Sequence, residues 1–545
     1  MAIEEMMTKA LTGLDTPAQL KGGDPGTYIE YFDDSGIQPE PSRTVGCFVV
    51  ETDRGYVGRR KIRSIDQYRR MYGHNPMLST SCFGPLNHLR YSNSAQVVRA
   101  TGGATAGVAV LATIPADDTA PEEFVRRTML LPALVGEQGD PKDVRMSDDM
   151  AVAFVSLHPG TLRVEIRLEP HFESPLGGFK VFVHSALGEE YHHVTFKHRQ
   201  DGYNSQMHIE ERINSKSEVI NVFVNPNFVD ALVDELIDVP MKVVLGGAVA
   251  GSKVDDVEVI DCMRHFIDKD DCLADLIVQN GWTSPQISNI MDGITQYRQD
   301  CMALHDVPLA LAGNREEIIL YREERLALDS PLSTLYVDWL NVRDPVTRSV
   351  LVVPGSAIAA GCYAYTDITD MPTASPAGKR RGALERFGVI DTYKKAFDRE
   401  DRHILARHQC NAVRKIDEDG MYIWLDVTTQ KLESVQSFIG PVRLRLKLHK
   451  RIVAISEEYH FDVQNEVYQR SVEAGIRDLL KKEQMSKTIS TYSVTWTAKN
   501  TLAENMRGVV YLRIEYTAMA TNRQMFIDCH LTSTGVYTLY QGEGQ

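Results

Sequence analysis

The chain has 545 residues, more than a single compact hydrophobic core uses, so we expect roughly two to four domains. Hydrophobic residues make up 43% and charged residues 24%, as in soluble globular proteins, and the net charge of −15 argues against binding nucleic acid or anionic membranes. The first fifteen residues are acidic where a signal peptide is basic, and no window approaches the roughly 18 apolar residues of a membrane span. We therefore expect cytosolic synthesis and no membrane anchor.

Residues 1–26 are predicted to form an N-terminal arm, because 21–26 (KGGDPG) is rich in turn-forming residues. A short strand is predicted over 27–32. Residues 44–104 then alternate strand and helix. Strands are expected at 45–52 and 95–100, with a helix between them that begins after Ser64 and ends at Gly73.

Residues 105–254 are predicted to be β-rich. The segment 162–168 alternates apolar and polar residues strictly, as a strand with one buried face does. Further strands are expected at 179–184, 191–197, 219–224 and 241–245, with one helix at 229–237. His192 and His193 suggest metal binding, but neighbouring strand residues point to opposite faces and cannot share one ion. The glycine run 246–251 is interpreted as a loose hinge.

Residues 255–395 return to alternating strands and helices, which predicts a mostly parallel sheet with right-handed crossovers. Strands are expected at 273–278, 301–304, 335–340 and 350–353, and helices at 287–298 and 314–327. A turn at Asp344–Pro345 separates the last two strands. Small residues after Pro354 predict a helix packed closely against a sheet, and we expect Ser356 to cap it.

The last part, 396–545, is predicted to hold strands at 412–416 and 421–427, two helices, and a strand pair at 492–497 and 509–517. Pro441 is placed at the first position of the first helix. The second helix, 465–483, carries one polar face. This face comprises Arg470, Glu473, Arg477 and Lys481.

Motifs of catalysis are missing from the sequence. It holds no phosphate-binding G-x-x-x-x-G-K-[ST] loop, and Gly355-Ser356-Ala357 lacks the frame of a nucleophile elbow. The eight cysteines include no C-x-x-C pair and lie mostly beside apolar residues, which indicates buried, reduced thiols. We therefore predict no enzyme activity, no cofactor and no metal. A disulfide between subunits is left open.

The order of several short motifs resembles that of contractile bacteriophage tail sheath proteins. These motifs are PGTYIE at 25–30, RQDCMA at 298–303, DVP at 306–308, VPGS at 353–356, AGCYAYTD at 360–367 and SPAG at 375–378. The resemblance covers roughly residues 24–104 and 270–530, and FDVQN at 461–465 departs from it by lacking the family's proline.

The resemblance implies an α/β and α+β multidomain fold. Its parts are the arm 1–26, an α/β sheath core of 27–104 plus 255–395, a β-rich inserted outer domain 105–254, and a C-terminal inner domain 396–545 that faces the tail tube. It also implies hexameric rings stacked around a tail tube, which contract to drive the tube through the host envelope during genome ejection. The implied partners are further copies of the chain, the tube protein, and baseplate and neck or terminator proteins. The protein would be assembled in the host cytoplasm and reside in the virion.

Two sites follow from this interpretation. The predicted strand at 28–32 is expected to be exchanged between subunits; its residues are Tyr28, Ile29, Glu30, Tyr31 and Phe32. The polar face of helix 465–483 is expected to meet the tube, although a solvent-exposed face fits equally well. The alternatives are the sheath of a related secretion or bacteriocin-type injection system, or an α/β ligand-binding enzyme.

Overall fold

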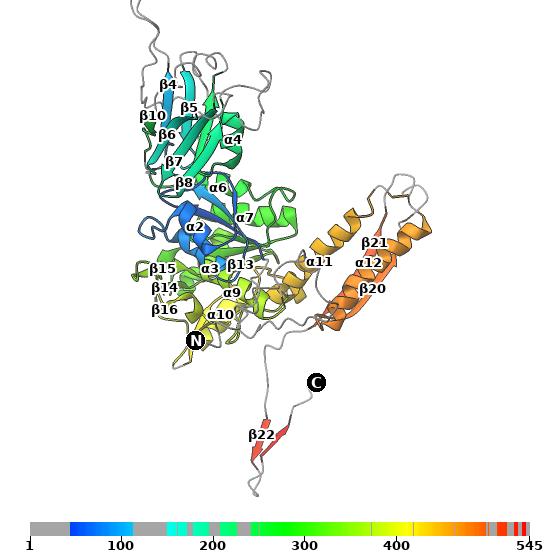
Figure 1. Cartoon of the computed structure of the whole chain (residues 1–545). Coiled ribbons are helices and arrows are strands. Elements are labelled where there is room, and N and C mark those ends of the chain that lie inside the picture. The colour runs from blue at the N-terminus through cyan, green and yellow to red at the C-terminus, as the bar shows by residue number, and fades with distance from the viewer. Residues whose placement is uncertain are drawn as a thin grey trace, which may run out of the picture. The chain divides into compact units, whose positions relative to one another are not determined.

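The computed structural model describes the chain from residue 44 to residue 540 with gaps (Figure 1). The residues not described are 1–43, 113–149, 161, 172–177, 196–207, 226–240, 250, 372, 418, 461, 464, 498–499, 501–509, 520–527, 532–536 and 541–545. The predicted strand at 27–32 and helix at 229–237 lie outside the described residues.

A seven-stranded sheet forms the core. Its strands are β1 (Gly46–Glu51), β2 (Arg60–Ile62), β3 (Ala95–Ala100), β11 (Leu276–Val278), β12 (Met302–Asp306), β13 (Ser333–Tyr336) and β17 (Cys410–Asn411). They lie in the order β17–β13–β12–β11–β1–β3–β2, and all neighbours run parallel except β2 and β3. The mostly parallel sheet predicted from the sequence is confirmed.

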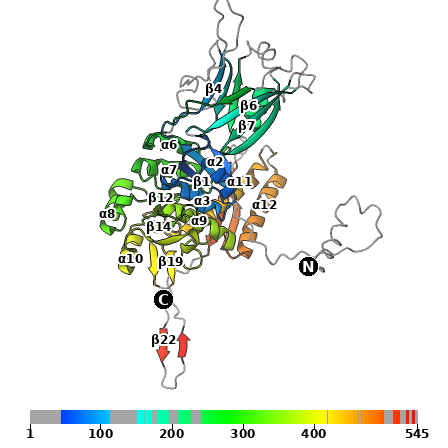
Figure 2. The same cartoon turned by 60° about the vertical axis from the view of Figure 1, so that its left-hand side comes forward.

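Helices cover both faces of this sheet (Figure 2). Phe48 and Val50 of β1 face a core that they share with α2 (Ile65–Tyr72), α3 (Phe83–Leu89) and α9 (Gly355–Thr369). Cys47 and Val49 face the opposite core, which includes α6 (Asp256–Arg264) and α7 (Pro285–Arg298). Successive residues of a strand thus pack into two different cores, which explains why the strand sequences are almost continuously apolar.

The helix predicted after Ser64 is confirmed with both ends. The Ser64 side chain accepts a hydrogen bond from the Gln67 N–H, and Gly73 ends α2 with φ of 77°. The expected helix at 287–298 is present as α7. The polar helix at 314–327 is present as α8 (Arg315–Leu320), which continues into a π-helical turn, Tyr321–Leu326. Short 3-10 turns lie at Thr80–Cys82, Leu309–Leu311, Glu385–Phe387 and Val435–Ser437.

The strand predicted at 335–340 is divided in two. β13 ends at Tyr336 in the core sheet, and β14 (Trp339–Arg343) begins a separate antiparallel sheet with β15 (Val350–Pro354) and β16 (Val389–Thr392). Asp338 lies at the break, where its carboxylate accepts a hydrogen bond from the Val413 N–H at 2.6 Å. This buried polar residue interrupts what hydrophobicity alone suggests is one strand.

Ser356 does not cap α9, contrary to our expectation. Pro354 occupies the cap position, and Ser356 lies one residue inside the helix. The capping group is instead the carboxylate of Asp306 at the end of β12, which accepts a hydrogen bond from the Ser356 N–H at 2.7 Å. The Ser356 hydroxyl donates to the same carboxylate. A cap supplied by a distant strand leaves no local sequence signal.

Residues 105–254 contain two antiparallel sheets around one hydrophobic core. The first has the order β4–β5–β9, formed by Val108–Ala112, Met150–Ser156 and Ile220–Val224. The second has the order β10–β6–β7–β8, formed by Met241–Val244, Val164–His171, Gly178–Ser185 and Gly188–Val194. Helix α4 (Ile209–Lys216), which the sequence analysis missed, adds Ile209 and Ile213 to the shared core. His192 is buried, whereas His193 is only partly so, as expected for opposite faces.

The glycine run 246–251 is not a loose hinge. The segment that returns to the core pairs with the segment that leaves it: Val108 and Gly246 exchange backbone hydrogen bonds at 2.8 and 3.1 Å. The Ser252 N–H donates to the Gly102 carbonyl at 2.8 Å. A Cβ on Gly251 would lie 1.8 Å from the Thr101 carbonyl oxygen, so glycine is needed for this close approach.

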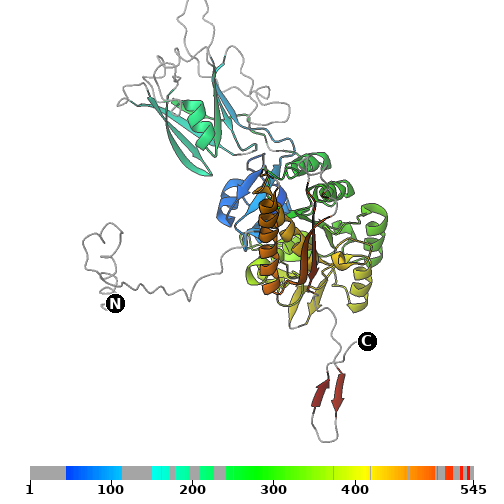
Figure 3. The same cartoon turned by 90° about the vertical axis from the view of Figure 1, so that its right-hand side faces the viewer.

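The C-terminal part begins with α10 (Arg399–Arg407) and β17, followed by the hairpin of β18 (Val413–Ile416) and β19 (Gly420–Ile423). Two long helices follow, α11 (Ile439–Glu457) and α12 (Glu466–Met485); Pro441 is the third residue of α11 and not the first. Helix α12 packs against the antiparallel pair β20 (Ile489–Trp496) and β21 (Leu512–Ala518), drawn in orange and brown in Figure 3. A last hairpin is formed by β22 (Asp528–Leu531) and β23 (Tyr537–Tyr540).

Candidate functional site

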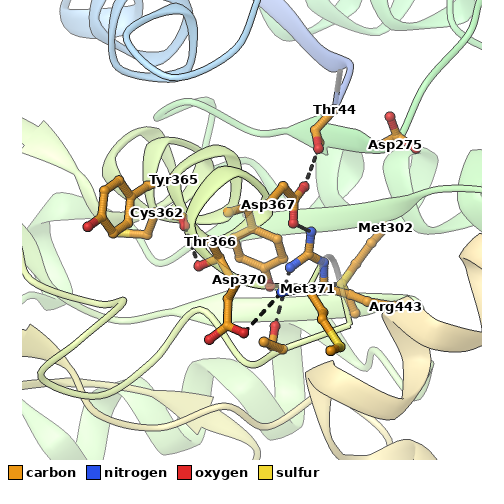
Figure 4. Close-up of polar contacts among 12 residues, drawn as sticks. Thr44, Asp275, Met302, Cys362, Tyr365, Thr366, Asp367, Asp370, Met371 and Arg443 are labelled. Carbon is orange, nitrogen blue, oxygen red and sulfur yellow. Dashed lines mark hydrogen bonds and ion pairs between the residues drawn. The ribbon is translucent and has the colours of Figure 1, made fainter. Parts of the chain in front are cut away.

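Thr44, the first described residue, donates a hydrogen bond to a buried aspartate, Asp367 (Figure 4). Asp367 lies in the last turn of α9, and its side chain is 5% exposed. Its Oδ2 atom accepts a hydrogen bond from the Thr44 hydroxyl, and its Oδ1 atom accepts one from the Arg443 guanidinium of α11. One carboxylate therefore holds both the segment that follows residues 1–43 and the helix that begins the α11–α12 pair.

Arg443 is itself buried, with its side chain 8% exposed. Besides Asp367, its guanidinium donates to the Ala374 carbonyl at 3.3 Å and lies over the Tyr363 ring, 4.9 Å from its centroid. Burial removes water as an alternative partner for either charge, so each member of the pair depends on the other.

A second aspartate repeats this arrangement. Asp275, just before β11, accepts a hydrogen bond from the Val45 N–H on Oδ2 at 2.7 Å, and its Oδ1 pairs with the Lys450 ammonium. Lys450 also donates to the Ala274 carbonyl at 2.7 Å. Lys450 follows Arg443 by seven residues, close to two helical turns, so both cations extend from one side of α11.

We call these six residues the carboxylate clamp: Thr44, Val45, Asp275, Asp367, Arg443 and Lys450. Each aspartate uses one oxygen for the start of the described chain and the other for α11. Burial raises the pKa of Asp367, while the Arg443 charge and the Thr44 hydrogen bond oppose that rise. The clamp gives two segments that are distant in sequence one common attachment to the core.

The polar face predicted on α12 is present, and part of it is already paired. Arg470 forms an exposed ion pair with Glu466 at 3.3 Å, and Glu473 pairs with Arg477 at 2.6 Å. Arg477 also donates to the Val494 carbonyl of β20 at 3.0 Å, whereas Lys481 is exposed. This face lies opposite the buried residues Val472, Ile476, Leu479 and Leu480. Contact of this face with a tube stays a prediction.

The other predicted site, Tyr28, Ile29, Glu30, Tyr31 and Phe32, lies outside the described residues. The sequence analysis missed the clamp, although Arg443 and Lys450 lie in a cation-rich run, residues 443–451. Their seven-residue spacing was a usable signal for two cations on one helix face. The two aspartates carried no such signal, because only the fold brings positions 275 and 367 to the same helix.

Metal-binding clusters, membrane-spanning helices and disulfides were also sought among the described residues. Among them, no three histidine, cysteine or acidic side chains gather where they could share a metal ion. None of the helices in this part of the chain has the length and apolar character needed to cross a bilayer. The seven cysteines whose side chains the structure describes are buried and unpaired by disulfides.

Comparison with family models and with curated proteins gives no match. Solved structures, in contrast, match over most of the chain. The crystal structure of the sheath tail protein Lin1278 from Listeria innocua matches with a TM-score of 0.54 and 10% identity, covering 88% of this chain and 95% of that one. The chain has the fold of a contractile-tail sheath protein.

A second sheath structure agrees with this assignment. The sheath of PVC, an extracellular contractile injection system in its contracted state, matches with a TM-score of 0.50 and 12% identity, over 94% of this chain and 98% of that one. Both matches extend over nearly the whole of the matched sheath chain. The resemblance inferred from short sequence motifs is thereby confirmed at the level of the fold.

Proposed function

We propose that this protein is the sheath subunit of a contractile tail, with a structural and not a catalytic role. The observation that carries the proposal is the match of 94% and 88% of the chain to two sheath proteins. The clamp supports it, because a subunit that transmits force needs its connecting segments anchored in its rigid core.

Copies of the chain would be joined by exchanged strands. Within the described residues, β20 and β21 pair only with each other, so each keeps one edge without a strand partner. An extended segment such as 28–32 of a neighbouring copy can add to such an edge through backbone hydrogen bonds. Subunits linked in this way stay connected while their cores turn relative to one another.

The assembly that follows is a stack of six-membered rings around a tail tube. Contacts that are heterologous and do not close produce such helical stacks from asymmetric subunits. We assign 27–104 with 255–395 to the sheath core, 105–254 to an inserted outer domain, and 396–545 to an inner domain whose α12 face meets the tube. Baseplate and neck or terminator proteins would contact the two ends of the stack.

The energy for contraction would be stored during assembly, since the sequence offers no nucleotide-binding motif. In this account the extended stack is kinetically trapped and repacks into a larger interface when released. We favour a phage tail, in which contraction drives genome ejection and the protein resides in the virion. The second candidate is an extracellular injection system, which the match to the PVC sheath favours.

Removal of residues 1–30 tests the exchange of strands. The truncated protein is expected to fold and to stay monomeric, because the described core begins at residue 44 while most of the predicted exchanged strand is lost. Size-exclusion chromatography and electron microscopy provide the measurement. Removal of residues 1–20 alone is the matched control and is expected to leave assembly intact. If the protein that lacks residues 1–30 still forms long sheaths, strand exchange through residues 28–32 is contradicted.

A further inference from the structure

Three buried cysteines lie in the core on the α6 and α7 side of the sheet. Cys47 lies in β1, Cys272 lies in the loop before β11, and Cys301 directly precedes β12. All three are 0% exposed and belong to one hydrophobic cluster. Their positions connect them with the clamp, since Cys47 follows Val45 by two residues and Cys272 precedes Asp275 by three.

The thiols of Cys47 and Cys272 are neighbours in one buried cluster, and each shifts the pKa of the other. Neighbouring thiols meet the first requirement for a disulfide, which forms only between adjacent sulfur atoms. The loop that carries Cys272 is at the surface, because the adjacent Leu273 is 64% exposed. The switch requires local opening of this loop to admit a small molecule.

Two arginines make the surroundings of Cys272 cationic. The Arg59 charge acts on the Cys272 thiol, and Arg59 forms an ion pair with Asp271 at 2.6 Å. The buried Arg298 guanidinium donates to the Cys272 carbonyl at 2.8 Å, and Asp300 pairs with Arg298 at 2.8 Å.

These contacts separate the properties of the two thiols. The hydrogen bond from Cys47 and the charges of Arg59 and Arg298 lower the pKa of Cys272 to about 7, against the opposing effect of burial. Burial raises the pKa of Cys47 well above its ordinary value. Cys272 is thus the nucleophile of the pair, and Cys47 is a protonated neighbour placed to react second.

We propose that Cys47 and Cys272 form a thiol–disulfide switch whose substrates are low-molecular-weight disulfides such as oxidised glutathione. The Cys272 thiolate attacks one sulfur of glutathione disulfide, which forms a mixed disulfide and releases one glutathione thiolate. Cys47 then loses its proton and attacks the Cys272 sulfur, which forms the protein disulfide and releases the second glutathione. The protein loses two electrons and two protons, and both appear in the two reduced glutathione molecules.

The disulfide would join the start of β1 to the loop that leads to Asp275. This would fix the start of the described chain next to the clamp, independently of its ion pairs. Disulfides persist in oxidising surroundings and are reduced in the cytosol. A sheath subunit, as proposed above, would therefore be reduced during assembly and oxidised after release from the cell.

Incubation of the full-length, unassembled protein with oxidised glutathione tests the switch and does not depend on sheath formation. Peptide mapping by mass spectrometry is expected to find the Cys47 peptide linked to the Cys272 peptide, with loss of two of the eight thiols. The rate is expected to fall about tenfold from pH 8 to pH 6, because the thiolate fraction of a group with a pKa near 7 falls by that factor. For a thiol with its ordinary pKa, the rate would fall close to a hundredfold over the same pH change.

Three variants distinguish the pair from its neighbours. Cys47→Ser is expected to retain glutathione on Cys272 as a stable mixed disulfide, whereas Cys272→Ser leaves Cys47 unmodified. Cys301→Ser is the matched control and is expected to form the disulfide at the normal rate. Two results on the wild-type protein would each overturn the proposal: both thiols free after oxidation, or Cys272 linked to Cys301 instead.

Discussion

Replacing Arg443 by methionine is expected to destabilise the protein by about 3–5 kcal/mol, the usual cost of removing one partner from a buried ion pair. Asp367 would keep its Thr44 hydrogen bond but would lose the only cation paired with it among the described residues. Chemical denaturation monitored by circular dichroism measures the change. Because the clamp holds α11 to the core, faster hydrogen exchange is also expected in the first turns of α11 and at Val45.

Arg470→Met is the matched control, since it removes the same charge from an exposed ion pair on α12. Its partner Glu466 is 85% exposed, so we expect a loss of less than about 1 kcal/mol. The double variant Asp367→Asn with Arg443→Met is expected to regain at least half of the stability, because no uncompensated charge remains buried. Equal effects of Arg443→Met and Arg470→Met would contradict the role assigned to the clamp.

Replacing Asp338 by asparagine is expected to make the stability less dependent on pH. Burial raises the pKa of Asp338 to about 7, and the hydrogen bond from the Val413 N–H and the Arg402 charge only partly oppose this. The folded state thus binds a proton more tightly than the unfolded state. The resulting stabilisation is complete below the ordinary pKa of 3.8 and is lost as the pH rises through about 7.

Between pH 5 and pH 8, the free energy of unfolding of the wild-type protein is therefore expected to fall by about 2–3 kcal/mol more than that of Asp338→Asn. Asparagine is neutral at both values and can accept the same hydrogen bond through its amide oxygen. Thermal unfolding at the two pH values measures the difference, and the exposed Asp261→Asn serves as the control with the wild-type dependence. Parallel curves for wild type and Asp338→Asn would show that the Asp338 carboxyl does not titrate in this range.

The sequence predicted those elements whose ends are set locally. Ser64 and Gly73 define α2 because a cap and a left-handed glycine act within one helical turn. Predictions failed where a distant group decides the local structure. Asp306 caps α9 across the sheet, and a backbone pairing with 102–108 orders the glycines at 246–251. No window of local sequence contains both partners in these cases.

The candidate site could be predicted only in part. The cationic run of α11 was visible in the sequence, and its spacing places Arg443 and Lys450 on one side of a helix. Asp275 and Asp367 could not be assigned to it, because they are 92 residues apart and meet α11 only through the folded core. The same limit applies to Cys47 and Cys272, which read as separate buried thiols until the sheet brings them together.

Electron microscopy of the purified full-length protein tests the central claim most directly. If the chain is a sheath subunit whose terminal segments link its copies, concentrated protein is expected to form hollow cylinders with a regular ring repeat and sixfold symmetry in cross-section. Separate particles of monomer size that persist at high concentration, with a bound metabolite that raises the unfolding temperature, would contradict it and favour the ligand-binding alternative.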